Sequence, residues 1–191
     1  MNGAGASDLV LALVCAVVIL TQRRARPGVA LAAGLIGLAA AIGVLRFSGL
    51  VAMTGPNKFA SLLSAVAAFP LLAFSLRYPA SRVALHVGAA VRPLLVLVAA
   101  GVALNMAGVT AWGPALSLGS VLVMLATMAW RRQYVAALGA LVLLGGMLAT
   151  LAGRAGAVTG FNPVVMLHLG LATGLALLVA GTARARTATA N

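Results

Sequence analysis

Long apolar segments follow one another along the whole chain, and short stretches between them hold nearly all of the charged residues. Each segment has roughly 17 to 25 residues, the length that an α-helix needs to cross a bilayer. Charged residues make up only 7% of the sequence, whereas a soluble domain carries about 25%. No polar stretch is long enough for a soluble domain. The sequence therefore predicts an all-α, polytopic membrane bundle in a single transmembrane domain, 1–191.

Seven of these segments are expected to be transmembrane helices, at about 5–21, 28–45, 59–76, 91–107, 114–130, 134–151 and 163–183. An amphipathic lead-in from Ser81 is expected before the fourth. Prolines stand at or just before several of the starts, where a missing backbone N–H costs little. These prolines are Pro27, Pro56, Pro114 and Pro163.

The basic residues divide unevenly between the two sides that seven crossings create. One side holds ten of them, in the loops around Arg23, Arg77 and Arg131 and after the last helix; the other holds only Arg46, Lys58 and Arg154. Because basic loops stay in the cytoplasm, this split predicts an N-out, C-in protein of the bacterial cytoplasmic membrane. The first basic cluster follows the first apolar run, which favours a retained helix over a cleaved signal.

The net charge of +12 would suggest nucleic acid in a soluble protein. Here the charges lie between apolar runs, so we expect membrane lipids as partners and no nucleic acid. Cys15 is the single cysteine and is expected to be a small buried hydrophobe. His86 and His168 fall toward opposite faces of the membrane. We therefore expect no metal site, no haem and no other cofactor.

His168 is the one strongly titratable group placed well inside a helix, where ionisable groups are costly and usually face the bundle interior. Histidine exchanges protons near neutral pH because its reference pKa is about 6.5. His168 is thus the candidate proton relay, with Asn105 as its candidate polar neighbour. The alternative is that His168 makes a neutral hydrogen bond to a neighbouring helix.

Two further kinds of site are open from the residues alone. Ser117 and Ser120 enter from the same side as His168, and the run HLGLATGLALL faintly resembles the histidine helix of rhomboid proteases. The GxSG motif of those proteases is absent, and membrane serines more often bond to the preceding turn. An intramembrane serine hydrolase is therefore the weakest of the functional hypotheses, and we assign no catalytic residue.

Polar residues at the outer helix ends are a second candidate site, for an anionic ligand or a lipid headgroup. They form an outer polar ring of Asp8, Arg46, Lys58 and Arg154, with Asn57, Asn105 and Asn162 beside it. A stand-alone transporter or ligand-binding membrane protein would use such a ring. Gly170 and Gly174 form a GxxxG pair that favours close helix packing, either within the bundle or against a partner subunit.

The order of features resembles component E of hydrogenase-4-type complexes, a family of seven-helix membrane subunits related to complex I. The first helix ends in the basic cluster LTQRRARPGVAL, and the third has a proline before its basic end, FPLLAFSLRYP, with Pro70 matching a family proline. A basic turn leads into a glycine-bearing helix through MAWRRQYVAALGALVLLGG, and the last helix ends in TARAR. The resemblance covers nearly the whole chain, although each motif is short.

The resemblance implies a non-catalytic subunit of an ion-translocating oxidoreductase complex that bridges larger membrane subunits. Three departures bear on its role. The family's glutamate aligns near Leu144, Gly145 and Gly146, its lysine aligns with Ala65, and an acid of its last helix falls near His168. Intramembrane acids and lysines carry protons in such relays. Their loss here leaves His168 as the group where an ion path would be sought.

Overall fold

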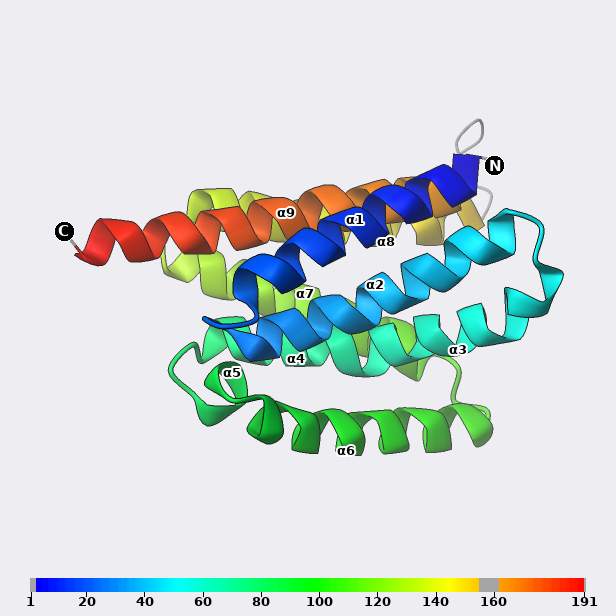
Figure 1. Ribbon diagram of the computed structural model, residues 1–191, viewed down its shortest axis with the longest axis horizontal. Coiled ribbons are helices and arrows are strands. Elements are labelled where there is room, and N and C mark those ends of the chain that lie inside the picture. The colour runs from blue at the N-terminus through cyan, green and yellow to red at the C-terminus, as the bar shows by residue number, and fades with distance from the viewer. Residues whose placement is uncertain (1–2, 155–161, 191) are drawn as a thin grey trace.

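The computed structural model describes residues 3–154 and 162–190, with side chains described apart from those of 51, 154 and 184–190. Every regular element in these ranges is helical (Figure 1). The long helices are α1 (Gly3–Gln22), α2 (Pro27–Phe47), α6 (Val87–Met106), α7 (Trp112–Trp130), α8 (Tyr134–Arg154) and α9 (Pro163–Ala190). Shorter pieces are η1 (Val51–Met53), α3 (Thr54–Leu63), the π-helical η2 (Ser64–Ala68), α4 (Phe69–Arg77) and α5 (Arg82–Leu85).

Seven helices within the described ranges are long and apolar enough to cross a membrane, with α3, η2 and α4 joined into one span, Thr54–Arg77. The predicted all-α bundle of seven transmembrane helices is confirmed. The third span begins at Thr54, earlier than the predicted 59, because its first turn continues through polar residues. The lead-in expected before the fourth helix is the separate turn α5, and α9 extends past the predicted end at 183.

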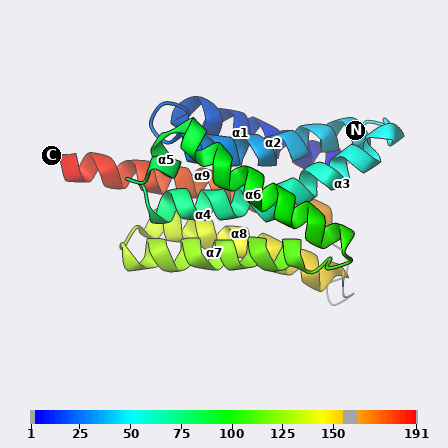
Figure 2. The ribbon, with the colours of Figure 1, turned by 90° about the horizontal axis from the view of Figure 1, so that it is seen from below.

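Six of the spans pack in a closed ring, and α6 lies outside it. Around the ring each helix contacts the next in the order α1, α2, α4, α7, α8, α9 and back to α1. Figure 2 shows α6 on one side of the bundle, across η2 and α4. Only Ala90 and Gly101 of α6 are buried, and Gly101 packs against Val66 of η2. The core lies inside the ring, where Leu71, Met124 and Leu178 are almost fully buried.

Glycines bring α8 and α9 close together. A Cβ on Gly170 would lie 3.0 Å from the Cα of Gly146, and a Cβ on Gly174 would lie 2.7 Å from the carbonyl oxygen of Gly139. Small residues allow such close backbone approach in a membrane, where dispersion holds helices together. The GxxxG face of α9 is therefore occupied by α8 of the same chain and does not supply the partner interface that was the alternative.

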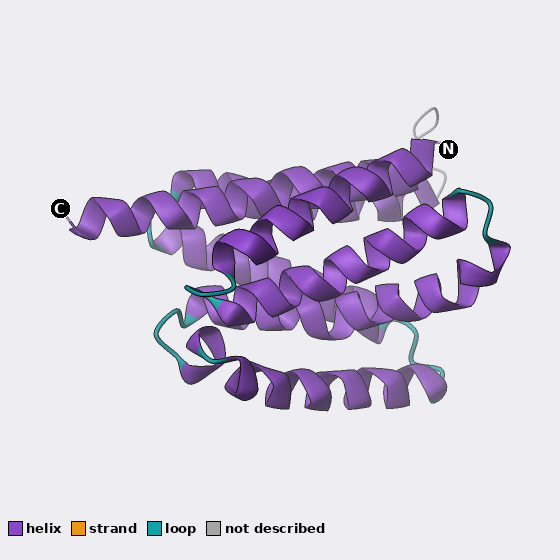
Figure 3. Ribbon diagram, viewed as in Figure 1, coloured by secondary structure: helices purple, strands orange, loops and turns teal. Residues whose placement is uncertain are grey.

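The connections between the spans gather at two opposite ends of the bundle (Figure 3). The turns that follow α1, α4 and α7 lie at one end, which we call the basic end because Arg23, Arg82 and Arg131 are there. The N-terminal end of α1 and the turns that follow α2 and α6 lie at the other, which we call the Asp8 end. The spans thus alternate in direction, as the predicted division of basic residues requires.

Candidate functional site

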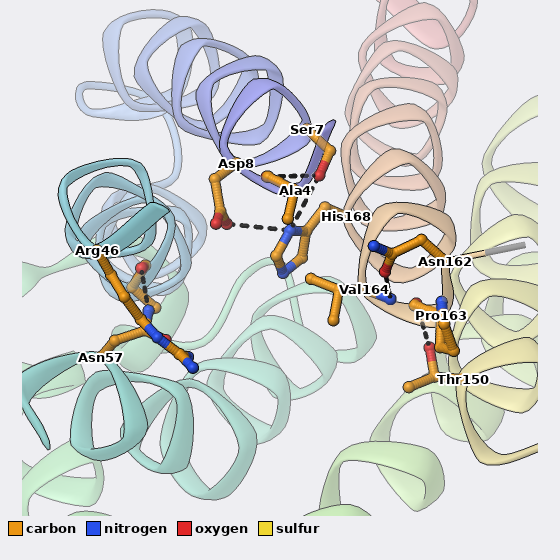
Figure 4. Close-up of polar contacts among 11 residues, drawn as sticks. Ala4, Ser7, Asp8, Arg46, Asn57, Thr150, Asn162, Pro163, Val164 and His168 are labelled. Atoms are coloured by element: carbon orange, nitrogen blue, oxygen red, sulfur yellow. Dashed lines mark hydrogen bonds and ion pairs between the residues drawn. The ribbon is translucent and has the colours of Figure 1, made fainter. Parts of the chain in front are cut away.

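The only carboxylate side chain of the protein meets a histidine between the first and last helices. Asp8 lies in the second turn of α1 and His168 in the second turn of α9, and these helices pack side by side. Asp8 Oδ1 is 3.0 Å from His168 Nδ1, with the two side chains 3% and 17% exposed (Figure 4). Because the two groups lie at the same depth in adjacent helices, they form one carboxylate–imidazole pair, in which the carboxylate is buried and the imidazole is partly buried.

Ser7 lies on the same nitrogen of the imidazole. Its Oγ is 3.3 Å from His168 Nδ1 and donates a hydrogen bond of 2.8 Å to the carbonyl of Ala4. Since the hydroxyl proton is directed at that carbonyl, Nδ1 is assigned as the protonated nitrogen, which donates to Asp8. Nε2 then carries the lone pair, and it makes no hydrogen bond to the described residues. The imidazole is thus held on one nitrogen and open on the other.

The second oxygen of Asp8 faces α2. Oδ2 is buried without a hydrogen-bond partner among the described residues, and the carboxylate rests on Gly43, where a Cβ would lie only 2.6 Å from Asp8 Cγ. Arg46, one turn along α2, interacts with the carboxylate through space. Its Nη1 donates to Asn57 Oδ1 at 3.2 Å, and Asn57 donates to the carbonyl of Ala39. The Asp8 end therefore holds a polar cluster that spans α1, α2, α3 and α9.

A second polar cluster joins the same two helices at the basic end. Arg26 is 3% exposed; its Nε donates to Gln22 Oε1 and its Nη1 to Thr182 Oγ1, each at 2.8 Å. In the sequence, Arg26 counts only among the basic loop residues, and neither Gln22 nor Thr182 was singled out as a candidate. The one sequence feature that could have pointed to a structural role for Arg26 is its position directly before Pro27, where the chain enters a helix. Arg26 thus links the neighbouring helices α1 and α9 at the basic end.

The outer polar ring is not a single exposed feature. Asp8 is buried, because its carboxylate is covered by Gly43 and His168. Lys58 is exposed, and the side chain of Arg154 lies outside the described residues. Of the three members whose side chains the structure describes, Asp8 and Arg46 lie near each other and Lys58 is apart from them.

Asn105 is exposed near the end of α6 and is not the polar neighbour of His168, whose hydrogen-bonding contacts come from α1. Asn162 caps α9 by accepting a bond from Val164 N at 3.0 Å. His86 is exposed between α5 and α6 at the basic end. The two histidines are therefore at opposite ends of the bundle, as predicted from the crossings.

The contacts of the histidines and serines bear on metal binding and on hydrolysis. One acid does lie beside a histidine, because Asp8 contacts His168. Still, no group of three or more histidine, cysteine or acidic residues that could hold a metal is found in the described ranges. Ser117 and Ser120 donate to carbonyls of their own preceding turns. A catalytic triad needs its serine and its carboxylate on different imidazole nitrogens.

Ser7 shares Nδ1 with Asp8, so the serine that does lie beside His168 is not activated as a nucleophile.

Comparison of the chain with known protein families, with characterised proteins and with solved structures finds no match.

Proposed function

We propose that this chain is a non-catalytic membrane subunit of an ion-translocating oxidoreductase complex related to complex I and group 4 hydrogenases. In this proposal it bridges larger membrane subunits, lies N-out and C-in in a bacterial cytoplasmic membrane, and exchanges protons at the Asp8–His168 pair. The single observation that carries the proton-exchange role is the buried contact between Asp8 and His168. The bridging role is carried by the resemblance of the basic turns, Pro70 and the basic tail to the component E family.

The scarcity of titratable residues in this protein makes the Asp8–His168 pair a candidate for proton exchange. The protein has one acidic residue and two histidines, and it places the acid against one histidine inside the bundle. Ionisable groups within transmembrane helices are costly to insert and are characteristic of ion and proton pathways. The family's glutamate and lysine positions are occupied here by small or apolar residues. In this proposal Asp8 and His168 supply a titratable pair in a different place.

The geometry supports a simple proton exchange. Asp8 holds the imidazole through Nδ1–H, so that Nε2 can accept a proton from the Asp8 end of the bundle. The resulting imidazolium keeps its contact with Asp8 and is balanced by it. Release of the same proton from Nε2 to an acceptor on a partner subunit restores the neutral ring. Histidine suits this exchange because its reference pKa is about 6.5.

A second candidate function is a stand-alone transporter or ligand-binding membrane protein with a polar site at the Asp8 end. The hydrogen bond from Arg46 to Asn57, beside the Asp8 carboxylate, favours it because it assembles a cation and an amide near one helix end. Such a protein would be isolated alone, whereas a bridging subunit would be isolated with its neighbours.

Purification distinguishes the subunit proposal from the stand-alone alternative. The tagged chain is extracted from its own host membrane in a mild detergent, sized on a native gel, and its co-purifying proteins are identified by mass spectrometry. We expect a large assembly that contains antiporter-like and redox subunits. A monodisperse protein without partners would instead favour the stand-alone reading and refute the subunit proposal.

Proton exchange is tested in the same assembly by His168→Gln, His168→Leu and Asp8→Asn. Inverted vesicles are energised with the electron donor of the co-purified complex, and proton uptake is followed with a pH-sensitive dye. Glutamine keeps a polar contact but cannot titrate near neutral pH, so we expect both histidine variants to assemble and to lose uptake. Full uptake by the glutamine variant, with lowered stability only for leucine, would show a packing role and refute the relay.

A further inference from the structure

An open groove lies between α1 and α9 in the half of the bundle toward the basic end. It has a volume of about 450 Å³ and is almost entirely apolar. Its α1 wall consists of Leu13, Val14, Val17, Val18, Thr21 and Gln22. Its α9 wall consists of Ala176, Val179, Ala180 and Ala183. Large side chains on one wall face small side chains on the other, which leaves the space between them unfilled.

The groove ends where polar contacts hold the two helices together. The Asp8–His168 contact clamps α1 against α9 at the Asp8 end, and the helix axes diverge from there toward the basic end (Figure 1). At the basic end the long side chain of Arg26 bridges the gap and reaches Thr182. Between these contacts the small residues of α9 do not fill the opening. The groove is therefore a consequence of how the two polar clusters position the helices.

The length of the groove matches one leaflet of a bilayer. Its α1 wall runs from Leu13 to Gln22, which corresponds to about 14 Å at the helical rise of 1.5 Å per residue. One leaflet contributes half of a hydrocarbon core that is about 30 Å thick. A partner transmembrane helix would need a contact face along the whole core, whereas a lipid acyl chain needs only this half.

The basic residues at the end of the groove favour a lipid with an anionic headgroup. Arg23 and Arg24 follow Gln22 directly and are both exposed. The only acidic residue of the protein, Asp8, is at the opposite end of α1. A phosphate at the Arg23 end of the groove would therefore meet two guanidinium groups and no carboxylate side chain. Guanidinium groups bind phosphate through charge-assisted hydrogen bonds.

We propose that the α1–α9 groove binds one anionic phospholipid, with an acyl chain against Ala176 and Ala180 and the phosphate of its headgroup on Arg23 and Arg24. Anionic lipids are enriched in the cytoplasmic leaflet, which is the leaflet that the basic end would face in the proposed orientation. The lipid site does not require the oxidoreductase complex. It would hold for a stand-alone membrane protein of the same fold.

The acyl-chain part is tested by filling the groove. The full chain is purified in detergent, and binding of phosphatidylglycerol and of phosphatidylcholine is titrated by native mass spectrometry. The variant Ala176→Phe/Ala180→Phe fills the groove; Ala99→Phe/Ala103→Phe makes the same change at the same spacing on the exposed face of α6. We expect the first variant to lose the tightly bound phosphatidylglycerol and the second to keep it. Equal binding by both would overturn the site.

The headgroup part is tested by neutralising charge without touching the groove walls. Arg23→Gln/Arg24→Gln is compared with Arg82→Gln/Arg92→Gln, which removes two exposed charges at the same end of the bundle. We expect phosphatidylglycerol to bind roughly fivefold more weakly for each of Arg23 and Arg24 removed, while phosphatidylcholine changes little. The control pair should leave the preference intact.

Because these four arginines are exposed, this comparison decides the proposal even if the phenylalanine variants fail to fold. Two results would overturn it. One is a wild-type protein that binds phosphatidylcholine as tightly as phosphatidylglycerol. The other is a groove-filling variant that releases a partner subunit from the complex and still binds lipid, which would identify the occupant as a protein helix.

Discussion

Replacing Gly43 by alanine should break the contact between α2 and the Asp8 carboxylate. A Cβ at this position would lie 2.6 Å from Asp8 Cγ and would meet both carboxylate oxygens. Asp8 is buried, and its carboxylate lies at the end of a short side chain, so it cannot move aside without leaving His168. Gly43→Ala is therefore expected to act on Asp8 from a different helix, without altering either member of the pair.

The expected change in the free energy of unfolding is the difference between two opposing effects. Loss of a buried hydrogen bond to a charged group costs about 1.5–3 kcal/mol, and alanine in place of a helical glycine returns about 0.5–1 kcal/mol. Gly43→Ala should thus lower the free energy of unfolding by about 0.5–2.5 kcal/mol. Gly34 lies on the same helix, and a Cβ there meets nothing within 4 Å. Gly34→Ala is the matched control and should raise stability by about 0.5–1 kcal/mol.

A double-mutant cycle isolates the cause. Both glycine variants are made in the wild-type chain and in Asp8→Ala, where the carboxylate that clashes is gone. Unfolding is followed by circular dichroism as a denaturing detergent is added to mixed micelles. In the Asp8→Ala background, Gly43→Ala should resemble Gly34→Ala. If Gly43→Ala costs the same in both backgrounds, within about 0.5 kcal/mol, the assigned packing of Asp8 on Gly43 is wrong.

Three further outcomes are expected. Gly174→Ala should destabilise the α8–α9 pair and Gly145→Ala should not, because a Cβ on Gly174 meets Leu143 whereas one on Gly145 meets nothing within 4 Å; thermal unfolding in detergent compares them. Arg132→Gly should raise stability by about 1 kcal/mol, measured in the same way, because Arg132 has a φ of 57° that glycine adopts without strain. In a Cys15-free chain, a membrane-impermeant thiol reagent added outside should label a cysteine at Thr110 but not at Arg132, and the reverse result would invert the proposed orientation.

The sequence by itself determined the class of protein and the number of crossings. Apolar runs of sufficient length must be helical in a bilayer, because backbone polar groups have no other way to be satisfied there. The positions of Asp8 and His168 near the ends of the first and last spans also indicated that both lie toward the same face. Both residues were singled out from the sequence, but Asp8 as part of the outer polar ring and His168 as the candidate proton relay.

Only the tertiary structure decided that Asp8 and His168 meet, that Arg26 reaches Thr182, and that Asn105 has no part in the site. A soluble helix marks its buried face with an apolar stripe, whereas these helices are apolar all round, so periodicity does not reveal which faces pack. Helix partners in a membrane are chosen by close contact of small residues, such as Gly146 against Gly170. The packing of α9 against α1 closes the ring, and it is this closure that creates both the carboxylate–imidazole pair and the groove beside it.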